Sequence, residues 1–221
     1  MKKEFFTRPE KITETWNTWQ CFMLGIPSMV FVVTGWKANG KENACLQSWT
    51  AFTPCGKDDF ACIMSQVSKS GHMYQSLKET GVCVLNFPSL DVYDRCIKTI
   101  GNNDYDTDEI TAAGLTAEPA SKVNAPCIKE CFLNIECELM WEHELYDEPN
   151  VWGNQDVTIA LKVVNICMDS DRYDQGKLGR YGKTGYLFQI DDPTNPETGE
   201  QSKNINQATI ELSSPIPWET K

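Results

Sequence analysis

Hydroxyl, amide and basic side chains gather at the ends of apolar runs in three neighbouring stretches of this chain, residues 43–54, 63–72 and 79–88. Such side chains donate and accept hydrogen bonds, while the apolar residues beside them keep a scaffold rigid. None of the stretches resembles a Ser-His-Asp or Cys-His nucleophile, because neither of the two histidines lies in such a motif. The pattern favours binding of a polar, phosphorylated ligand at the edge of a sheet.

The elements that must position these side chains are mostly strands. Apolar runs rich in β-branched and aromatic residues predict them, and short turns such as Asn39-Gly40 connect them. The alternation is clearest over residues 131–141, where every second residue from Leu133 to Trp141 shares one apolar face. The expected strands cover residues 29–36, 44–52, 60–65, 82–87, 131–141, 157–168, 185–190 and 208–212.

Helices are fewer. Gly81 is placed to end a helix that follows Ser70 and Gly71, and Ser89 can cap another that ends before Gly101. These strands and helices predict a mainly β fold, an antiparallel barrel with a few peripheral helices. Without an internal repeat or linker, residues 1–221 are expected to form a single domain. The expected helices cover residues 72–79, 89–100 and 108–115, the expected loops 169–183 and 191–203, and an N-terminal arm residues 1–20.

The balance of charges argues against several partners. The chain has 20 Lys and Arg against 31 Asp and Glu, a net charge of −11 and a pI near 4.7. Such a field repels phosphate, so binding to nucleic acid or to an anionic membrane is not expected. No secretory signal follows Met1, and the longest apolar stretches are too short to span a bilayer. The protein is therefore expected to be cytoplasmic.

Ten cysteines are spread along the chain without a Cys-x-x-Cys pair. The densest group is Cys127, Cys131 and Cys137, which would need a fourth ligand to hold zinc in a chain with only two histidines. Free and mostly buried thiols are expected, and no metal site.

Five segments together resemble the flavin reductase-like proteins with an FMN-binding split barrel, in particular the flavoredoxin-like group. No single motif is specific, but all five occur in the family's order and cover about residues 30–140. The resemblance implies an antiparallel split β-barrel, bound FMN and a homodimer with one flavin per subunit near the interface. The matching segments are residues 33–36, 43–54, 65–72, 79–88 and 114–130.

The resemblance also implies which residues bind the cofactor. Asn43 and residues 47–50 would lie along the ring and ribityl chain, residues 65–72 would hold the phosphate, and Asn86 would face the ring. A Ser and Gly turn before a helix suits a phosphate, because several N–H groups and the positive end of the helix dipole meet one anion. The expected FMN-binding residues are Asn43, Gln47, Ser48, Trp49, Thr50, Ser65, Val67, Ser68, Lys69, His72 and Asn86.

Taken alone, most of these residues also fit ordinary structural roles. A hydroxyl or amide can serve a turn, a sheet or a helix cap, Trp49 can be core, and Lys69 can be a solvated charge. His72 alone fits an exposed or capping position.

Three functions stay open at this point. The first is an FMN-dependent oxidoreductase that takes hydride from NADH or NADPH, with no catalytic side chain because the reaction needs placement above all. The second is an electron carrier reduced by a ferredoxin-like protein, for which an acidic surface suits a basic partner. The third is a non-redox flavin-binding protein, since a fold does not fix a function.

Overall fold

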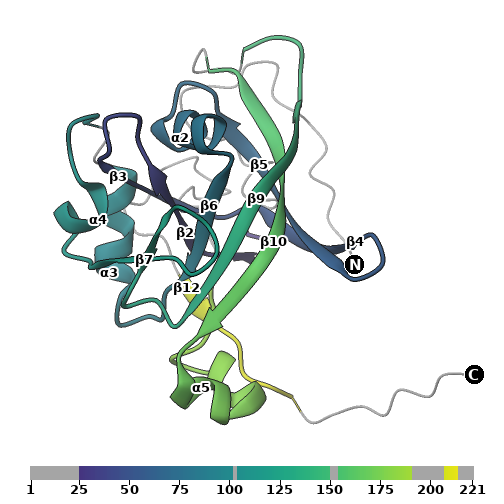
Figure 1. Ribbon diagram of the computed structural model, residues 1–221. Helices are drawn as coiled ribbons and strands as arrows, with labels where there is room; N and C mark the ends of the chain where they lie inside the picture. Colours follow the sequence, from purple (N-terminus) through teal and green to yellow (C-terminus); the bar gives the residue numbers. More distant parts are fainter. Residues whose placement is uncertain (1–24, 102–103, 150–153, 191–206, 214–221) are drawn as a thin grey trace, which may run out of the picture.

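The computed structural model describes residues 25–101, 104–149, 154–190 and 207–213 (Figure 1). The expected N-terminal arm, the expected loop 191–203 and Cys21 lie outside these ranges. Within them the chain is mainly β, with antiparallel pairing between all neighbouring strands. The predicted mainly β, antiparallel class is therefore confirmed.

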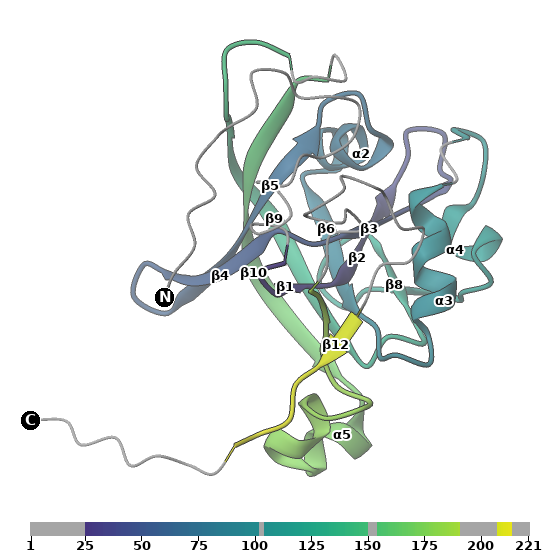
Figure 2. The ribbon, with the colours of Figure 1, turned by 180° about the vertical axis from the view of Figure 1, so that it is seen from behind.

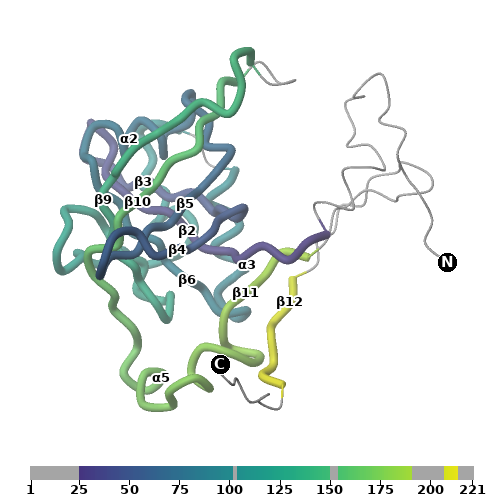
Figure 3. Tube along the Cα trace, turned by 90° about the vertical axis from the view of Figure 1, so that its right-hand side faces the viewer, coloured from purple at the N-terminus to yellow at the C-terminus, as the bar shows by residue number. Residues whose placement is uncertain are grey.

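A seven-stranded sheet forms the body of the molecule, and two smaller sheets complete it (Figures 1 and 2). The large sheet runs in the order β3 (Glu42–Gln47), β2 (Phe31–Trp36), β6 (Val82–Phe87), β9 (Leu133–Glu144), β10 (Asp156–Met168), β5 (Asp59–Ser68) and β4 (Thr50–Cys55). The small sheets contain β1 (Ser28–Met29), β11 (Leu187–Gln189) and β12 (Gln207–Thr209), and β7 (Ala117–Pro119) and β8 (Pro126–Ile128). Figure 3 shows β11 and β12 running side by side below the body.

The main core fills the space that the large sheet encloses. Phe31, Phe87 and Phe132 are buried there with Ile159 and Leu161. Aliphatic and aromatic side chains of this kind supply most of the stabilisation of such a fold, because their burial removes apolar surface from water.

The alternation predicted for residues 131–141 fails at its end. Leu139 lies opposite Leu161 but Trp141 lies opposite Ala160, so β9 uses two residues where β10 uses one. Beyond such a bulge, each side chain of the strand points to the face opposite to the one that regular alternation predicts. Trp141 is therefore 38% exposed on the outer face of the sheet and does not join the core.

The strand predicted over residues 44–52 is interrupted. β3 ends at Gln47 and β4 begins at Thr50, and Trp49 between them has a φ of 52°. A positive φ cannot continue a strand, so the chain turns a corner here. β4 then runs through Pro54 to Cys55, because an edge strand tolerates a proline.

Helices lie at the margins of the sheet. α2 (His72–Thr80) ends as predicted at Gly81, whose φ of 70° and N–H bond to the Leu77 carbonyl form a left-handed cap. The helix predicted from Ser89 is shorter, consisting of α3 (Tyr93–Cys96) and the 3-10 turn η1 (Ile97–Ile100), because the Ser89 hydroxyl donates to Asp91. α4 (Glu109–Ala112) confirms the third predicted helix and packs with η1 against β3.

The segment 169–183, predicted as a loop, contains α5 (Ser170–Asp174) and η2 (Gly176–Arg180). The two helical turns pack closely, since a Cβ at Gly179 would lie 1.9 Å from the Arg172 carbonyl oxygen. Figures 1 and 2 show α5 and α2 at opposite ends of the molecule.

A fully buried carboxylate links β9 to the loop that follows β7. Glu136 accepts hydrogen bonds from Asn165 at 2.7 Å and from the N–H groups of Ser121, Lys122 and Val123 at 3.0, 2.6 and 3.0 Å. Burial by itself would raise the pKa of Glu136, but the hydrogen bonds to the carboxylate have the larger effect. The pKa of Glu136 is therefore lower than that of a free glutamate. Glu136 lies on the opposite side of β9 from the apolar face, and the loop covers it there.

Replacing Glu136 with glutamine is expected to lower the free energy of unfolding at pH 7 by about 1–3 kcal/mol, because the amide presents N–H groups to donors. The pKa of Glu136 is lower in the folded than in the unfolded protein, where a glutamate titrates at about 4.3. The ionised carboxylate therefore contributes its full stabilisation above about pH 4.3, and this contribution is lost as the pH falls through the folded pKa. The gap between Glu136→Gln and the unaltered protein should therefore narrow below about pH 4 in urea unfolding curves. Glu138→Gln, at an exposed position of β9, is the control; a gap that does not change with pH would contradict this assignment.

Candidate functional site

The corner at Trp49 joins three strands. Its N–H donates to the Ser28 hydroxyl of β1 at 2.6 Å. Its carbonyl accepts from both the N–H and the hydroxyl of Ser65 of β5, each at 3.3 Å. The left-handed backbone of Trp49 is thus held from both sides, and its indole is left 36% exposed at the rim of the sheet.

Two hollows flank this corner and share Trp49. The larger, the Trp49 groove, has a volume of about 400 Å³, within the range of small-molecule sites. The smaller, the glutamine pocket, has a volume of about 130 Å³. The Trp49 groove is lined by Ile26, Pro27, Ser28, Trp49, Thr50, Ala51, Ile63 and Ser65. The glutamine pocket is lined by Val30, Leu46, Gln47, Ser48, Trp49, Gln66, Ile100 and Gln189.

Five of the predicted residues therefore meet at one place. Gln47 and Ser48 line the glutamine pocket, Thr50 and Ser65 line the Trp49 groove, and Trp49 lines both. The Thr50 hydroxyl donates to the Ile63 carbonyl at 3.1 Å and lies 3.4 Å from the Cys62 thiol, and its oxygen can still accept a hydrogen bond. The Gln47 amide donates to the Cys45 thiol at 3.2 Å.

A bulge in β5 brings in a residue that the sequence did not single out. Met64 pairs with Ile159 and Val67 with Val157, so Ser65 and Gln66 together face one residue of β10. Gln66 has a φ of 56° and lines the glutamine pocket. Val67, a predicted site residue, is turned into the core at 1% exposure. A sequence interpreted as regular alternation could not show that Gln66 lines the pocket while Val67 points into the core.

The other predicted phosphate residues lie where β5 leads into α2. The hydroxyls of Ser68 and Ser70 are 2.9 Å apart. Lys69 pairs with Glu144, and this hydrogen bond raises the pKa of Lys69. Gly71 provides no side chain to cap α2, so the first N–H groups of the helix point outward without a side-chain acceptor at the cap position. A serine-rich turn and an open helix start thus occur together.

His72, the first residue of α2, faces a buried ion pair. Its Nδ1 lies 3.5 Å from Oε1 of Glu109, and its ring meets that of Tyr105 edge-on at 5.6 Å. The same carboxylate oxygen pairs with the buried Lys37 ammonium at 2.8 Å. Asn43 lies nearby and is 2% exposed, with its amide donating to Ser76 at 3.0 Å. Asn43 thus joins β3 to α2 and is separate from the Trp49 corner.

Asn86 does not face either hollow. It is completely buried, and its amide donates to Val32, Thr34 and Val84 at distances between 2.9 and 3.2 Å. Its oxygen accepts from Ile128 N–H and from Asn134, each at 2.8 Å. With its polar atoms occupied, Asn86 joins β2, β6, β8 and β9, and the expectation that it faces a ligand does not fit this position.

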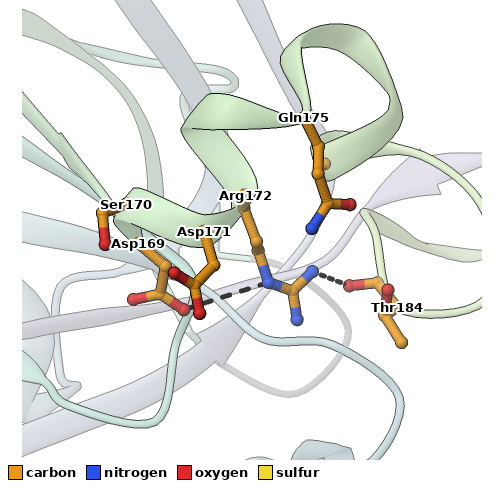
Figure 4. A pocket seen from close by; sticks show the side chains of 7 residues that line it. Asp169, Ser170, Asp171, Arg172, Gln175 and Thr184 are labelled. Carbon is orange, nitrogen blue, oxygen red and sulfur yellow. Dashed lines mark hydrogen bonds and ion pairs between the residues drawn. The ribbon is translucent and has the colours of Figure 1, made fainter.

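A third hollow, of about 430 Å³, lies beside α5 and contains none of the predicted site residues (Figure 4). Figure 4 shows Arg172 reaching toward Asp169 and Thr184. Its guanidinium also lies 4.4 Å above the ring of Phe132. These contacts fix α5 against the end of the sheet and give Arg172 a structural role.

The nine cysteines of the described ranges are free thiols. Burial raises the pKa of Cys62 to about 11 and that of Cys127 to about 12, so both remain protonated and unreactive at neutral pH. The described ranges contain no group of three or more metal-ligating residues. No helix within them is long and apolar enough to cross a membrane.

Comparison with known proteins places this geometry in context. Residues 23–185 match the flavin reductase like domain. An uncharacterized protein from Methanothermobacter thermautotrophicus is 31% identical over 116 residues, which cover 52% of each chain. A second, from Aquifex aeolicus, is 27% identical over 117 residues, covering 51% of this chain and 58% of the relative. The chain thus spans only about half the length of the curated relatives that it matches.

Solved structures share the fold at low sequence identity. A Shewanella frigidimarina protein with a split barrel domain has a TM-score of 0.71 at 16% identity and covers 98% of this chain and 100% of its own. The flavoredoxin of Desulfovibrio vulgaris has a TM-score of 0.61 at 15% identity, covering 98% and 97%. An FMN-binding protein from Thermus thermophilus has a TM-score of 0.67 at 13% identity, covering 97% and 100%.

Proposed function

Because the chain belongs to the flavin reductase-like family, whose members typically bind a flavin, we propose that it is an FMN-dependent oxidoreductase. In this proposal, residues 1–221 form one domain that moves electrons from NAD(P)H through FMN to an acceptor. The observation that carries it is the corner at Trp49, where five residues of the expected motif line two adjoining hollows.

The spacing of the two residue groups suits a flavin mononucleotide. Ser65 at the corner and Ser68 at the turn are three residues apart on β5, so they are separated by at most about 10 Å. A ring at Trp49 and a phosphate at the start of α2 can therefore be joined by an extended ribityl chain. Lys69 is already paired with Glu144, so the N–H groups of α2 and the hydroxyls of Ser68 and Ser70 supply most of the phosphate contacts.

The residues around the corner have positioning roles in this proposal. Bound FMN supplies the electron chemistry, and the protein orients it and limits the access of water. The indole of Trp49 provides an apolar wall, while Thr50 and Ser65 offer hydroxyl groups at the rim. Among the described residues, no acidic or basic side chain lines either hollow, which is consistent with a reaction that depends on placement.

Anaerobic mixing with NADH or NADPH tests the enzymatic function. Bleaching of the flavin absorbance within seconds is the expected result. If neither nucleotide bleaches the flavin but a reduced ferredoxin does, the protein is an electron carrier. The net charge of −11 supports that second function, because it would attract a basic protein donor. A flavin that neither donor reduces would leave only a non-redox role.

We also propose that the protein is a homodimer. Several large apolar side chains of β5, β9 and β10 stay exposed in the single chain, including Phe60 at 54% and Ile166 at 60%. Exposed apolar surface on long strands is commonly covered by a second copy. Sedimentation equilibrium should give twice the mass of one chain, and a monomer at micromolar concentration would rule the dimer out.

Thr50→Ala is expected to weaken FMN binding by about 1 kcal/mol, roughly fivefold in Kd, because one hydroxyl contact is lost. The matched control is Thr53→Ala on the same strand, because within the described ranges the Thr53 hydroxyl makes a single hydrogen bond, to the neighbouring Pro54 carbonyl. Titration of each apoprotein with FMN measures the effect. Equal affinities in the two variants would mean that Thr50 does not touch the cofactor.

A further inference from the structure

Backbone strain is concentrated at the glutamine pocket. Among the described residues other than glycine, Trp49 and Gln66 are the two with positive φ, at 52° and 56°. Both line this pocket, although they lie on different strands. A residue with a side chain is strained in the left-handed region and persists there where the surroundings impose it, often at ligand sites. The bulge that strains Gln66 also points its side chain at the pocket.

The lining of the pocket is suited to the edge of a polar heterocycle. Gln47, Ser48, Gln66 and Gln189 provide amides and a hydroxyl, and apolar residues such as Leu46 complete the lining. Gln47 already donates to Cys45, and Gln189 belongs to β11. The side chain of Gln66 makes no hydrogen bond within the described ranges, so both its carbonyl oxygen and its NH2 group are available.

We propose that Gln66 is a specificity-determining residue that reads the pyrimidine edge of the flavin ring; this inference rests on the proposed binding of FMN. The carbonyl oxygen of Gln66 accepts a hydrogen bond from the ring imide N–H, and its NH2 group donates to an adjacent ring carbonyl. A primary amide matches such an edge in two parallel hydrogen bonds. Without the bulge, position 66 would share the face of the buried Met64 and point into the core.

Gln66→Gly tests this role, because glycine accepts a positive φ without strain. The variant should have an unchanged or higher melting temperature, while its Kd for FMN rises about tenfold or more through the loss of the paired contact. Gln66→Glu is the matched variant, since it keeps the strain and the length but loses the NH2 donor. Its affinity for FMN should also fall.

The second probe is FMN methylated at the imide nitrogen. The unaltered protein should bind it at least tenfold more weakly than FMN, and Gln66→Gly should bind the two with similar Kd values. If Gln66→Gly binds FMN normally and still discriminates against the methylated form, Gln66 is only a structural bulge residue and the inference is overturned. If the unaltered protein binds no FMN, the proposed function fails first, and this inference fails with it.

Discussion

Replacing Glu109 with glutamine should lower the free energy of unfolding by about 3–5 kcal/mol, because it leaves a buried ammonium without its counter-charge. Lys37 and Glu109 are 3% and 2% exposed, and their charged groups are 2.8 Å apart. Lys37 also donates to the carbonyls of Asp104 and Thr107 at 3.0 and 2.9 Å. The other Glu109 oxygen accepts from Ala44 N–H at 2.7 Å.

Two comparisons separate the buried charge from other effects of this change. Asp108→Asn breaks the neighbouring pair between Asp108 and Lys41, which are 37% and 43% exposed, and should have a much smaller effect because water screens exposed charges. The double variant Lys37→Met with Glu109→Gln removes both charges and should be more stable than Glu109→Gln alone. Urea unfolding of the three variants measures this. A loss for Glu109→Gln no larger than that for Asp108→Asn would show that the buried pair is not stabilised by its charges.

Gly71→Asp should weaken FMN binding roughly a hundredfold and leave the fold intact. An aspartate at the cap position accepts the first N–H groups of α2, which stabilises the helix by about 1 kcal/mol. The same carboxylate repels a bound phosphate, by about 3 kcal/mol for two charges about 6 Å apart at an effective dielectric constant of about 20, which corresponds to roughly a hundredfold in Kd. The backbone of Gly71, with φ of −78° and ψ of 145°, accepts any residue.

Riboflavin and an asparagine variant provide the controls. Riboflavin has no phosphate, so its affinity should be similar in Gly71→Asp and in the unaltered protein. Gly71→Asn caps the helix without a charge and should retain more FMN affinity than Gly71→Asp. Each added Cβ meets the Ser68 carbonyl at 3.3 Å, so the small steric cost is shared by both variants. Equal FMN affinities for the two would place the phosphate away from α2.

Local patterns predicted the parts of the fold that depend on local physics. α2 was predictable because Gly81 provides the left-handed cap that ends the helix. β6 and β10 were predictable because their apolar and β-branched residues fit a buried sheet. The motif around Trp49 was also visible in the sequence, and the structure brings its residues together at one corner.

The positions that the sequence missed depend on contacts between distant segments. The bulge that brings Gln66 to the glutamine pocket and buries Val67 is set by the register of β5 against β10, which starts almost a hundred residues later. The position of Asn86 depends on Ile128 and Asn134, 42 and 48 residues along the chain. A pattern within one segment cannot show which long-range partner will fix a side chain.

The most direct test of the central claim is an equilibrium titration of the apoprotein with FMN and with riboflavin, followed by flavin fluorescence. A cofactor held by its ring at Trp49 and by its phosphate at the start of α2 should bind about a hundredfold more tightly than the same ring without phosphate, since each charge-assisted hydrogen bond contributes about 1.5–3 kcal/mol. Equal affinities for the two flavins, or no binding of FMN, would contradict this account.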